Sequence, residues 1–353
     1  MKFLIGEISS YKAIVICRYI KQHYPVSEII TYDFKPFTRY VRTKYSDRHY
    51  VLKYSNKENE LAELIKMEEI ECFIPVMSSE MELVLSRREM FGSSLFYLGE
   101  FESYRKLHYK NKLMELADSL CVRIPIQYRS IKEAVPPFII KPVNAASAAG
   151  VKYIMNEDDK SVLAGINEGE VVIQEYIKGF GAGYSLFCRN GNIISGFGHK
   201  RIAEYPVTGG SSVYRTNYQN PEMFSAAGAI ISALNWSGFC MFEFKINDRE
   251  EAYLIEANPR IWGSIYQGLA NGVNYFEGLL GPAENNSGFG VNTYLSPLIY
   301  RSLAGYLLKG NFAPVRRFLQ DKKRKPDISI LDDPGGYFNL IAKKLRFNLF
   351  DSR

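Results

Sequence analysis

The sequence has few of the features that mark secreted, zinc-binding or membrane-spanning proteins. Its five cysteines stand singly with no CxxC pair, so neither a disulfide framework nor a zinc site is predicted. No run of about 18 apolar residues occurs, and a glutamate at position 7 comes too early for a signal peptide. We therefore expect a cytoplasmic protein.

Excess positive charge is absent except at one end of the chain. The net charge of +6 over 353 residues gives no case for nucleic-acid binding. Residues 301–353 alone hold twelve Lys or Arg against five Asp. Because basic helices with Phe and Leu can lie on anionic membranes, this segment is predicted either to pack as a helical appendage or to touch the inner face of a membrane peripherally.

Apolar residues, by contrast, are plentiful. They make up 46% of the chain, enough for the cores of two or three domains. In the first 100 residues, apolar strands alternate with helical patterns: strand 3–5, helix 11–24, strand 28–32, helix 57–69, a strand from 71 and helix 79–90. This Rossmann-like pattern lacks GxGxxG in the loop at 6–10, so no dinucleotide site is predicted there.

A hairpin is predicted over residues 239–258. Residues 239–246 alternate apolar and polar, residues 247–251 form a polar break, and residues 252–258 read as the returning strand. If the loop is 248–251, Glu243 faces Glu256 directly, and like charges in that position need a positive charge between them. Mg²⁺ held by the two acids and the Asn258 amide would supply it. Solvated acids on an ordinary hairpin are the simpler alternative.

The same residues carry a family resemblance. Glu-Phe-Lys at 243–245 and Glu-Ala-Asn-Pro-Arg-Ile-Trp-Gly-Ser at 256–264 resemble the metal-binding hairpin of the ATP-grasp superfamily, in the form found in carbamoyl-phosphate-synthase-like carboxylate-amine ligases. The resemblance implies that Glu243, Glu256 and Asn258 hold Mg²⁺, or alternatively Mn²⁺, on the phosphates of ATP. It also implies that Arg260 contacts the transferred phosphoryl group.

By the same resemblance, further residues bind the nucleotide. Lys110, on a helix predicted at 105–120, matches the lysine of the family's Asp-Lys pair, although Tyr109 replaces the aspartate. Lys141 ends a strand, and the small residues after it, with Ser147 and Gly150, correspond to a phosphate-covering lid in which alanines replace the usual glycines. A solvated lysine and a flexible turn are the alternatives here.

The resemblance places the adenine at a bend after the strand at 171–175. There the carbonyl of Glu175 and the N–H of Ile177, on either side of Tyr176, would read the base. Residues 179–184 contain no acid that could bind the ribose, so that contact is unassigned.

Residues 199–211 are predicted to form a long charged loop closed by glycines, inside a sheet domain. Lys200 and Arg201 would join Arg260 as catalytic cations on an acyl phosphate. The residues predicted to shape the substrate pocket are His199, Glu204, Gly209, Gly210 and Trp262. A basic surface turn is the competing view, and His199 alone is more typical of a structural role.

Capping and turn signals place the other elements. Asn190-Gly191 between alternating runs predicts a hairpin, and Asn220-Pro221 predicts a helix start. Further helices are predicted at 264–281, 294–308 and 338–350. The expected fold is α/β (α+β): a Rossmann-like pre-ATP-grasp domain at 1–100, an ATP-grasp domain at 101–281 with a lid subdomain at about 120–180, and a basic helical extension at 282–353.

The function implied is an ATP-dependent carboxylate-amine ligase. It would form an amide through an acyl phosphate, release ADP and phosphate, and use a small acid such as an amino acid or sugar acid together with an amine. The resemblance also allows a homodimer. Two alternatives stay open: a non-catalytic nucleotide-binding regulator on the same fold, and an enzyme that uses bicarbonate and forms carboxy-phosphate.

Overall fold

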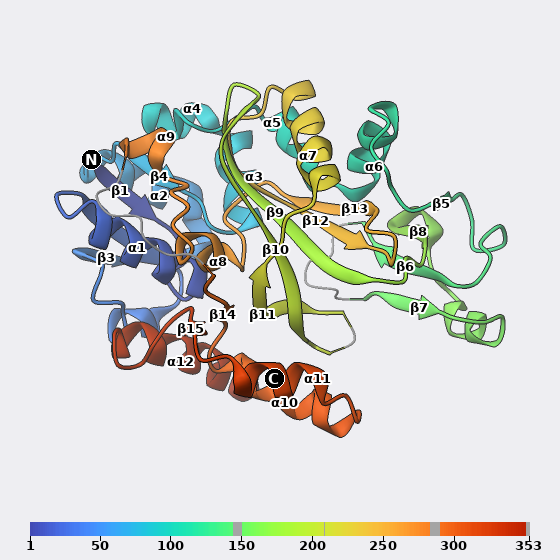
Figure 1. The fold of residues 1–353 in the computed structure, drawn as a ribbon. Coiled ribbons are helices and arrows are strands. Elements are labelled where there is room, and N and C mark those ends of the chain that lie inside the picture. Colours follow the sequence, from blue (N-terminus) through green and yellow to red (C-terminus); the bar gives the residue numbers. More distant parts are fainter. Residues whose placement is uncertain (144–149, 208, 283–289, 351–353) are drawn as a thin grey trace.

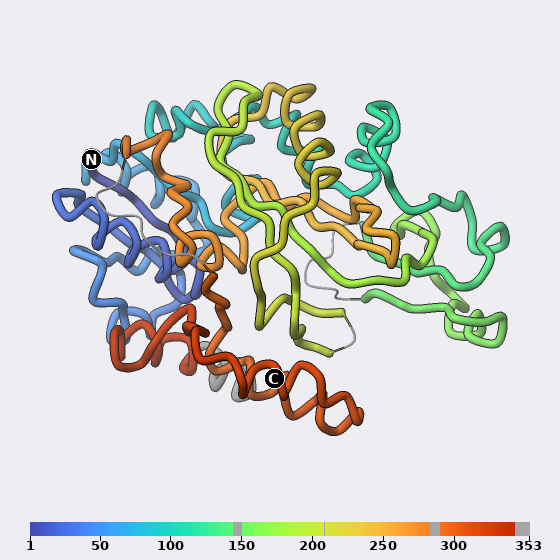
Figure 2. The backbone as a smooth tube through the Cα atoms, in the orientation of Figure 1, coloured from blue at the N-terminus to red at the C-terminus, as the bar shows by residue number. Residues whose placement is uncertain are grey.

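The computed structural model describes residues 1–143, 150–207, 209–282 and 290–350, with side chains up to residue 342. Its three β-sheets follow one another across the molecule, from the N-terminal unit through a long central sheet to a small third sheet (Figure 1). The C-terminal helices run along one side of the N-terminal unit and the central sheet, as the red part of the trace shows (Figure 2).

The first sheet confirms the predicted βαβ opening. Its strands are all parallel, in the order β3-β2-β1-β4. The elements of this unit are β1 (Lys2–Ile5), α1 (Tyr11–His23), β2 (Glu28–Asp33), β3 (Arg48–Val51), α2 (Lys57–Met67), β4 (Cys72–Ile74), α3 (Ser78–Ser86) and α4 (Arg88–Phe91). The single helix predicted at 79–90 is divided because Arg87 leaves the helical region, with φ −130° and ψ 35°.

The central sheet has the order β13-β12-β9-β10-β11-β14-β15. Its long strands are β9 (Phe180–Arg189), β10 (Asn192–Tyr205), β11 (Ser211–Asn217), β12 (Gly238–Ile246) and β13 (Ala252–Asn258). The predicted Asn190-Gly191 turn joins β9 to β10, and both residues have positive φ, as a two-residue hairpin loop requires.

One of the two helices predicted around the central sheet is confirmed, and the other is divided. Helix α7 (Pro221–Ala233) begins as predicted, and the Asn220 side chain accepts hydrogen bonds from the N–H groups of its first turn. The helix predicted at 264–281 is instead two short helices, α8 (Ile265–Leu269) and α9 (Glu277–Leu280). Gly272, at φ 84°, turns the chain between them.

The third sheet forms a small antiparallel unit with its own buried cluster. Its strands are β5 (Gln127–Tyr128), β6 (Phe138–Pro142), β7 (Lys152–Ile154) and β8 (Val171–Glu175). Two helices precede it, α5 (Phe101–His108) and α6 (Lys110–Ser119), where one was predicted. Tyr109 between them is extended, so α6 begins at Lys110. Short 3₁₀ helices cover 36–39, 54–56, 92–95, 158–163 and 168–170.

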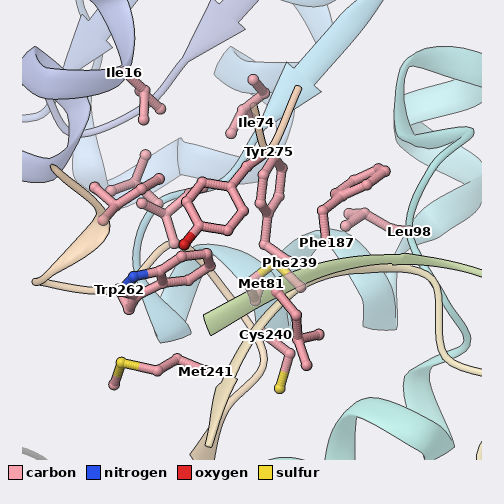
Figure 3. Close-up of a cluster of buried hydrophobic side chains, with 14 of the residues drawn as sticks. Ile16, Ile74, Met81, Leu98, Phe187, Phe239, Cys240, Met241, Trp262 and Tyr275 are labelled. Atoms are coloured by element: carbon pink, nitrogen blue, oxygen red, sulfur yellow. The ribbon is translucent and has the colours of Figure 1, made fainter. Parts of the chain in front are cut away.

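One hydrophobic core joins the first two sheets. Figure 3 shows Ile16 and Ile74 of the N-terminal unit in the same cluster as Phe187 and Phe239 of the central sheet. Trp262, which follows β13, is only 1% exposed and packs edge-on against Tyr275 with the ring centres 5.0 Å apart. The N-terminal unit and the central sheet are therefore packed through a shared interior.

The C-terminal extension is more closely built into the fold than a helical appendage. Strand β14 (Thr293–Tyr294) pairs with β11, and β15 (Lys325–Pro326) pairs with β14. Three helices complete the extension: α10 (Leu298–Leu308), α11 (Ala313–Gln320) and α12 (Pro334–Phe350). Within the described chain no helix is long and apolar enough to cross a membrane, and the predicted membrane-surface contact stays a prediction.

A fully buried ion pair ties this extension to the central sheet. Arg215 of β11 donates to Asp327, just after β15, and its Nε donates to Thr293 Oγ1 at 2.8 Å. The carboxylate of Asp333 also accepts from the backbone N–H of Lys44 at 3.2 Å, which holds the extension on the N-terminal unit. Removal of one member of a buried pair leaves the other charge without compensation.

We expect Asp327→Ala to lower the free energy of unfolding by about 3–5 kcal/mol, because it strands the Arg215 guanidinium in the interior. Urea denaturation measures this. The double variant Arg215→Met/Asp327→Leu should recover most of the loss, and Lys322→Ala, at an exposed position nearby, should change stability by less than about 0.5 kcal/mol. A loss below about 1 kcal/mol in Asp327→Ala would contradict a structural role for the pair.

Candidate functional site

The central and third sheets, helix starts of the N-terminal unit and the C-terminal extension surround a cavity of about 940 Å³. Its floor is the hairpin β12–β13, and its other walls come from the β10–β11 hairpin, the edge of the third sheet, the N-terminal unit and the start of α10. The lining side chains include Ser10, Lys12, Ser78, Lys110, Lys141, His199, Arg201, Glu204, Glu243, Glu256, Asn258, Arg260 and Arg301. Most of the residues that the sequence singled out thus meet in one place.

The two acids face each other as predicted, but the predicted loop at 248–251 is wrong: Ile246 pairs with Ala252, and a register shift between Glu243 and Phe244 restores the expected pairing. Glu243 of β12 lies opposite Glu256 of β13, and Met241 lies opposite Asn258. Strand alternation places Phe242 and Phe244 in the core, while Glu243 lines the cavity. Two carboxylates and one amide therefore stand together on the cavity floor.

Basic side chains meet both acids. Arg201 donates to Glu243 and lies 3.5 Å from Glu204, and Lys110 Nζ lies 3.6 Å from Glu256. Burial raises the pKa of Glu243 more than the charge of Arg201 lowers it. For Glu256 burial acts in the same direction, but the charges of Lys110 and Lys141 outweigh it and the pKa falls below its usual value.

Arg260 and Asn258 are held by each other. Arg260 Nη2 donates to Asn258 Oδ1 at 2.8 Å, and Arg260 Nε donates to Ser78 Oγ at 2.7 Å at the start of α3. Asn258 Nδ2 donates to Glu256 Oε1 at 3.3 Å. The amide oxygen of Asn258 therefore already accepts from a positively charged group. A bound metal cation could interact with the same oxygen.

The residue types at the floor fit a divalent cation that completes its shell with ligand oxygens. Across the described residues, no three His, Cys, Asp or Glu side chains could hold a metal ion by themselves. Mg²⁺ commonly takes only one or two carboxylates, with phosphate oxygens and water as its other ligands. Glu243, Glu256 and the Asn258 amide supply that kind of oxygen set.

Lys141 gives an independent sign of an anionic ligand. Its Nζ is buried beside the cavity with no hydrogen-bond partner among the described residues. Burial lowers the pKa of Lys141 to about 8, and the charge of Glu256 opposes that shift. Because an unpaired buried ammonium is costly, a negatively charged ligand would relieve a real penalty here.

The other residues predicted to bind the nucleotide do not all line the cavity. Glu175, Tyr176 and Ile177 line the cavity directly after β8, and Lys110 lines it from the first position of α6. Gly150 lies next to Pro142, is exposed to solvent and does not line the cavity. Ser147 lies outside the described residues.

The predicted loop at 199–211 is wrong. Strand β10 runs through residue 205 and pairs with β9 on one side and with β11, which begins at Ser211, on the other, so residues 199–205 belong to a strand. Strand alternation then separates the neighbours: His199 and Arg201 line the cavity, whereas Lys200 Nζ sits 3.3 Å from the centre of the Phe180 ring outside it. Lys200 is therefore withdrawn as a catalytic residue.

A bulge in β10 brings Glu204 back to the cavity face. The register shifts on both sides of Ala203, so Arg201 and Glu204 face the same way and form an ion pair. Gly209 and Gly210 line the cavity from the turn. Trp262 borders it, but its ring belongs mainly to the core.

His199 is buried with its ring against Gly183, where a Cβ would come within 2.5 Å of its Cε1. Burial lowers the pKa of His199 to about 3, and the charges of Arg201 and Arg215 add to the effect. The imidazole is therefore neutral at physiological pH.

Sequence analysis missed the wall formed by the N-terminal unit and the extension. Residues 9–12 and 77–79, together with Ser296 and Arg301, line this side of the cavity. Lys12 Nζ donates to the carbonyls of Val76 and Ile261, at 2.7 and 3.0 Å. Nothing in the local sequence marks these positions, because their meeting depends on how the units pack.

Comparisons with known proteins agree with this architecture. Residues 105–264 match the family model described as an ATP-grasp domain. The biotin carboxylase domain of 2-oxoglutarate carboxylase from Hydrogenobacter thermophilus, solved with MgADP, ADP and bicarbonate, superposes with a TM-score of 0.65 at 14% identity, over 82% of this chain and 71% of that chain.

Two other solved structures are similar. The L-amino acid ligase from Bacillus licheniformis has a TM-score of 0.57 at 14% identity, over 82% of this chain and 75% of its own. N5-carboxyaminoimidazole ribonucleotide synthetase from Thermotoga maritima has a TM-score of 0.57 at 14% identity, over 82% and 78%. At this identity the likeness establishes a shared fold. No curated protein matches the sequence.

We expect His199 to stay neutral from pH 5 to pH 9, because its burial beside Arg201 depresses its pKa to about 3. NMR titration of the imidazole resonances measures this, and His199→Gln identifies the His199 signal among the four histidines by its disappearance. A His199 resonance that titrates near pH 6.5, the usual value for an exposed imidazole, would contradict the buried environment.

Proposed function

Because residues 105–264 form an ATP-grasp domain, we propose that this protein is an ATP-dependent ligase that joins a small carboxylate to an amine. The observation that carries the proposal is that Glu243, Glu256 and Asn258 line the same cavity as the buried ammonium of Lys141, which has no hydrogen-bond partner among the described residues. Oxygen ligands for a cation and a buried positive charge for an anion are what a metal–nucleotide complex needs.

Glu243, Glu256 and Asn258 would hold Mg²⁺, with Mn²⁺ as an alternative. The ion neutralises part of the phosphate charge when it is bound. Arg201 and Lys110 now supply positive charge to the two acids, so a bound cation would free these side chains to face the ligand. Their position next to the acids supports a site in which a bound metal ion replaces Arg201 and Lys110 as the partner of the two carboxylates.

The chain's own cations would bind the triphosphate. Lys141 and Lys110 reach the cavity from β6 and α6, and residues 175–177 offer backbone groups at the bend after β8. A pocket that reads adenine by backbone groups needs no particular side chain.

The chemistry we propose has two displacements. An oxygen of the substrate carboxylate attacks the γ-phosphorus of ATP, and the bond between the γ-phosphorus and the oxygen that bridges to the β-phosphate breaks. ADP departs, and the substrate becomes an acyl phosphate. The amine nitrogen then attacks the acyl carbon, phosphate leaves, and the nitrogen loses its extra proton. Arg260, held against Asn258 and Ser78, would stabilise the charge on the transferred group.

A second candidate uses bicarbonate as the acid and forms carboxy-phosphate. It is favoured by the similarity in fold to a biotin carboxylase domain solved with bicarbonate and to a carboxyaminoimidazole ribonucleotide synthetase. The same cavity floor would serve both reactions, so the identity of the acid separates them.

We expect ADP release from MgATP to require a carboxylic acid and to yield an amide when an amine is present. A panel of acids, with bicarbonate among them, against amines in a coupled ADP assay measures this, and mass spectrometry identifies the product. Glu256→Ala should lower turnover by about 10²-fold or more with the melting temperature little changed, because it removes one carboxylate of the cation site. Asp248→Ala, at an exposed acid in the same hairpin turn, is the matched control.

Three results would change the assignment. Full activity in Glu256→Ala would move the cation elsewhere. ADP release that responds to bicarbonate alone would favour the second candidate. Nucleotide binding with no turnover across the whole panel would favour a regulator over an enzyme.

We expect MgATP binding near pH 8 to be accompanied by proton uptake at Lys141. Burial lowers its pKa to about 8 in the free protein, and a bound triphosphate favours the charged form, so nucleotide affinity should fall as the pH rises above about 8. At pH 6.5 the ammonium is already protonated and uptake should vanish. Calorimetry in buffers of different ionisation enthalpy measures the protons.

Lys141→Met should remove this uptake and weaken nucleotide binding by about 10- to 100-fold, since hydrogen bonds to charged groups contribute about 1.5–3 kcal/mol. Lys132→Met, at an exposed lysine of the same unit, should leave both unchanged. Uptake that persists in Lys141→Met would assign the proton to another group.

A further inference from the structure

The C-terminal extension supplies part of the cavity wall. Leu295, Ser296, Pro297 and Leu298 line the cavity at the start of α10, and Arg301 lines it one turn later. Leu298 and Arg301 are three residues apart, so they share one face of the helix. Figure 2 shows the C-terminal segment along one side of the N-terminal unit and the central sheet.

Hydrogen bonds hold α10 on the strand that carries Arg201. Ser302 Oγ donates to the carbonyl of Glu204 at 2.6 Å, and the Glu204 N–H donates to Tyr306 Oη at 3.2 Å. Gly305 lies against Val207, where a Cβ would come within 3.0 Å of the Val207 side chain. Arg301 therefore projects from a helix that is fixed to the β10–β11 hairpin.

The basic residues of the cavity differ in what they contact. Lys12, Lys110, Arg201, Lys245 and Arg260 all interact with protein oxygens. Lys141 has no hydrogen-bond partner among the described residues, but it is buried and lines the cavity from β6. Arg301 is exposed to the cavity and makes no hydrogen bond or ion pair with any residue in the described ranges. Its guanidinium is thus available to a ligand.

Helix starts add positive potential to the cavity that Arg301 lines. Three helices of at least nine residues begin at this cavity: α1, α3 and α10. Helix N-termini present N–H groups and a partial positive charge, and neither α1 nor α10 has an acid in its first turn. Glu80 caps the start of α3, where its carboxylate accepts from the N–H groups of Val76 and Met77.

Among the described residues, no acid of this wall lines the cavity. Of the described residues, the acids that line the cavity are Glu175, Glu204, Glu243 and Glu256, and all four belong to β8, β10, β12 and β13. The N-terminal unit and the extension contribute hydroxyls instead, from Ser9, Ser10, Ser78, Ser79 and Ser296. Hydroxyl donors, helix N-termini and a guanidinium with no partner in the described part of the chain together favour a negatively charged group.

We propose that this wall binds a second anionic group, either a carboxylate or a phosphate, on the acid that the enzyme activates, with Arg301 as its charge partner. The proposal rests on the ligase function above and names its substrate class: acids that carry a second negative charge away from the reacting carboxyl. At about 940 Å³ the cavity lies near the top of the usual range of about 300–1,000 Å³, which accommodates a substrate beside the nucleotide.

The test compares matched pairs of acids on the full chain. Butyrate with succinate and glycerate with 3-phosphoglycerate differ by one anionic group, a carboxylate in the first pair and a phosphate in the second. Hydroxylamine serves as the amine because it converts acyl phosphates to hydroxamates, so the natural amine is not needed. We expect the dianionic member of at least one pair to have a kcat/KM about 10- to 100-fold higher, and the preferred pair identifies the group.

Arg301→Gln should reduce that preference at least tenfold by raising the KM for the dianionic acid, and Arg301→Lys should restore part of it, since a lysine keeps the charge without the planar fork. Arg316→Gln, at an exposed arginine on α11, is the matched control. The proposal is overturned if Arg301→Gln lowers kcat/KM equally for both members of each pair, or raises the KM for hydroxylamine instead.

A binding measurement keeps the subsite separate from the reaction. With a non-hydrolysable MgATP analogue bound, the dianionic acid should raise the melting temperature of the wild-type protein more than its monoanionic partner does, and Arg301→Gln should abolish the difference. Stabilisation that depends on Arg301 without any ADP release would preserve the subsite and reject the ligase function. Equal stabilisation by both acids would reject the subsite.

Discussion

The structure depends on one electrostatic constraint: two carboxylates, Glu243 and Glu256, are held opposite each other by the pairing of β12 with β13. Such a pair is unfavourable unless positive charge is close by. Arg201 and Lys110 supply it, and they come from different parts of the fold, a central strand and the first position of α6. The two acids are thus contacted by side chains from both the central sheet and helix α6.

Rigid elements set the geometry around that floor. Strand β10 is paired on both sides, so alternation and one bulge decide that His199, Arg201 and Glu204 face the cavity while Lys200 does not. The opposite wall is fixed in another way, by the buried pair of Arg215 with Asp327 and by α10 bound to Glu204. The cavity is therefore enclosed by a sheet on one side and by packed helix starts on the other.

Much of the fold could be predicted because it rests on local periodicity. The βαβ opening, the 239–258 hairpin and the Asn220 cap follow from patterns within a few residues, and the ATP-grasp fold follows from the motif at 256–264. The register shift between Glu243 and Phe244 was not predicted. Prediction failed at 199–211, where polar residues on both faces of β10 hid the strand period. It also failed at Tyr109 and Gly272, where a single backbone conformation divides a helix.

The sequence by itself determined the hairpin, its facing acids and the amide beside them, because a two-residue alternation and a short turn dictate which side chains share a face. Only the tertiary structure decided which cations reach those acids and that Arg301 lines the same cavity. The reason is physical: residues as far apart in the sequence as Ser9 and Leu340 line this cavity because separate units pack together, and no local pattern encodes contacts over such a separation.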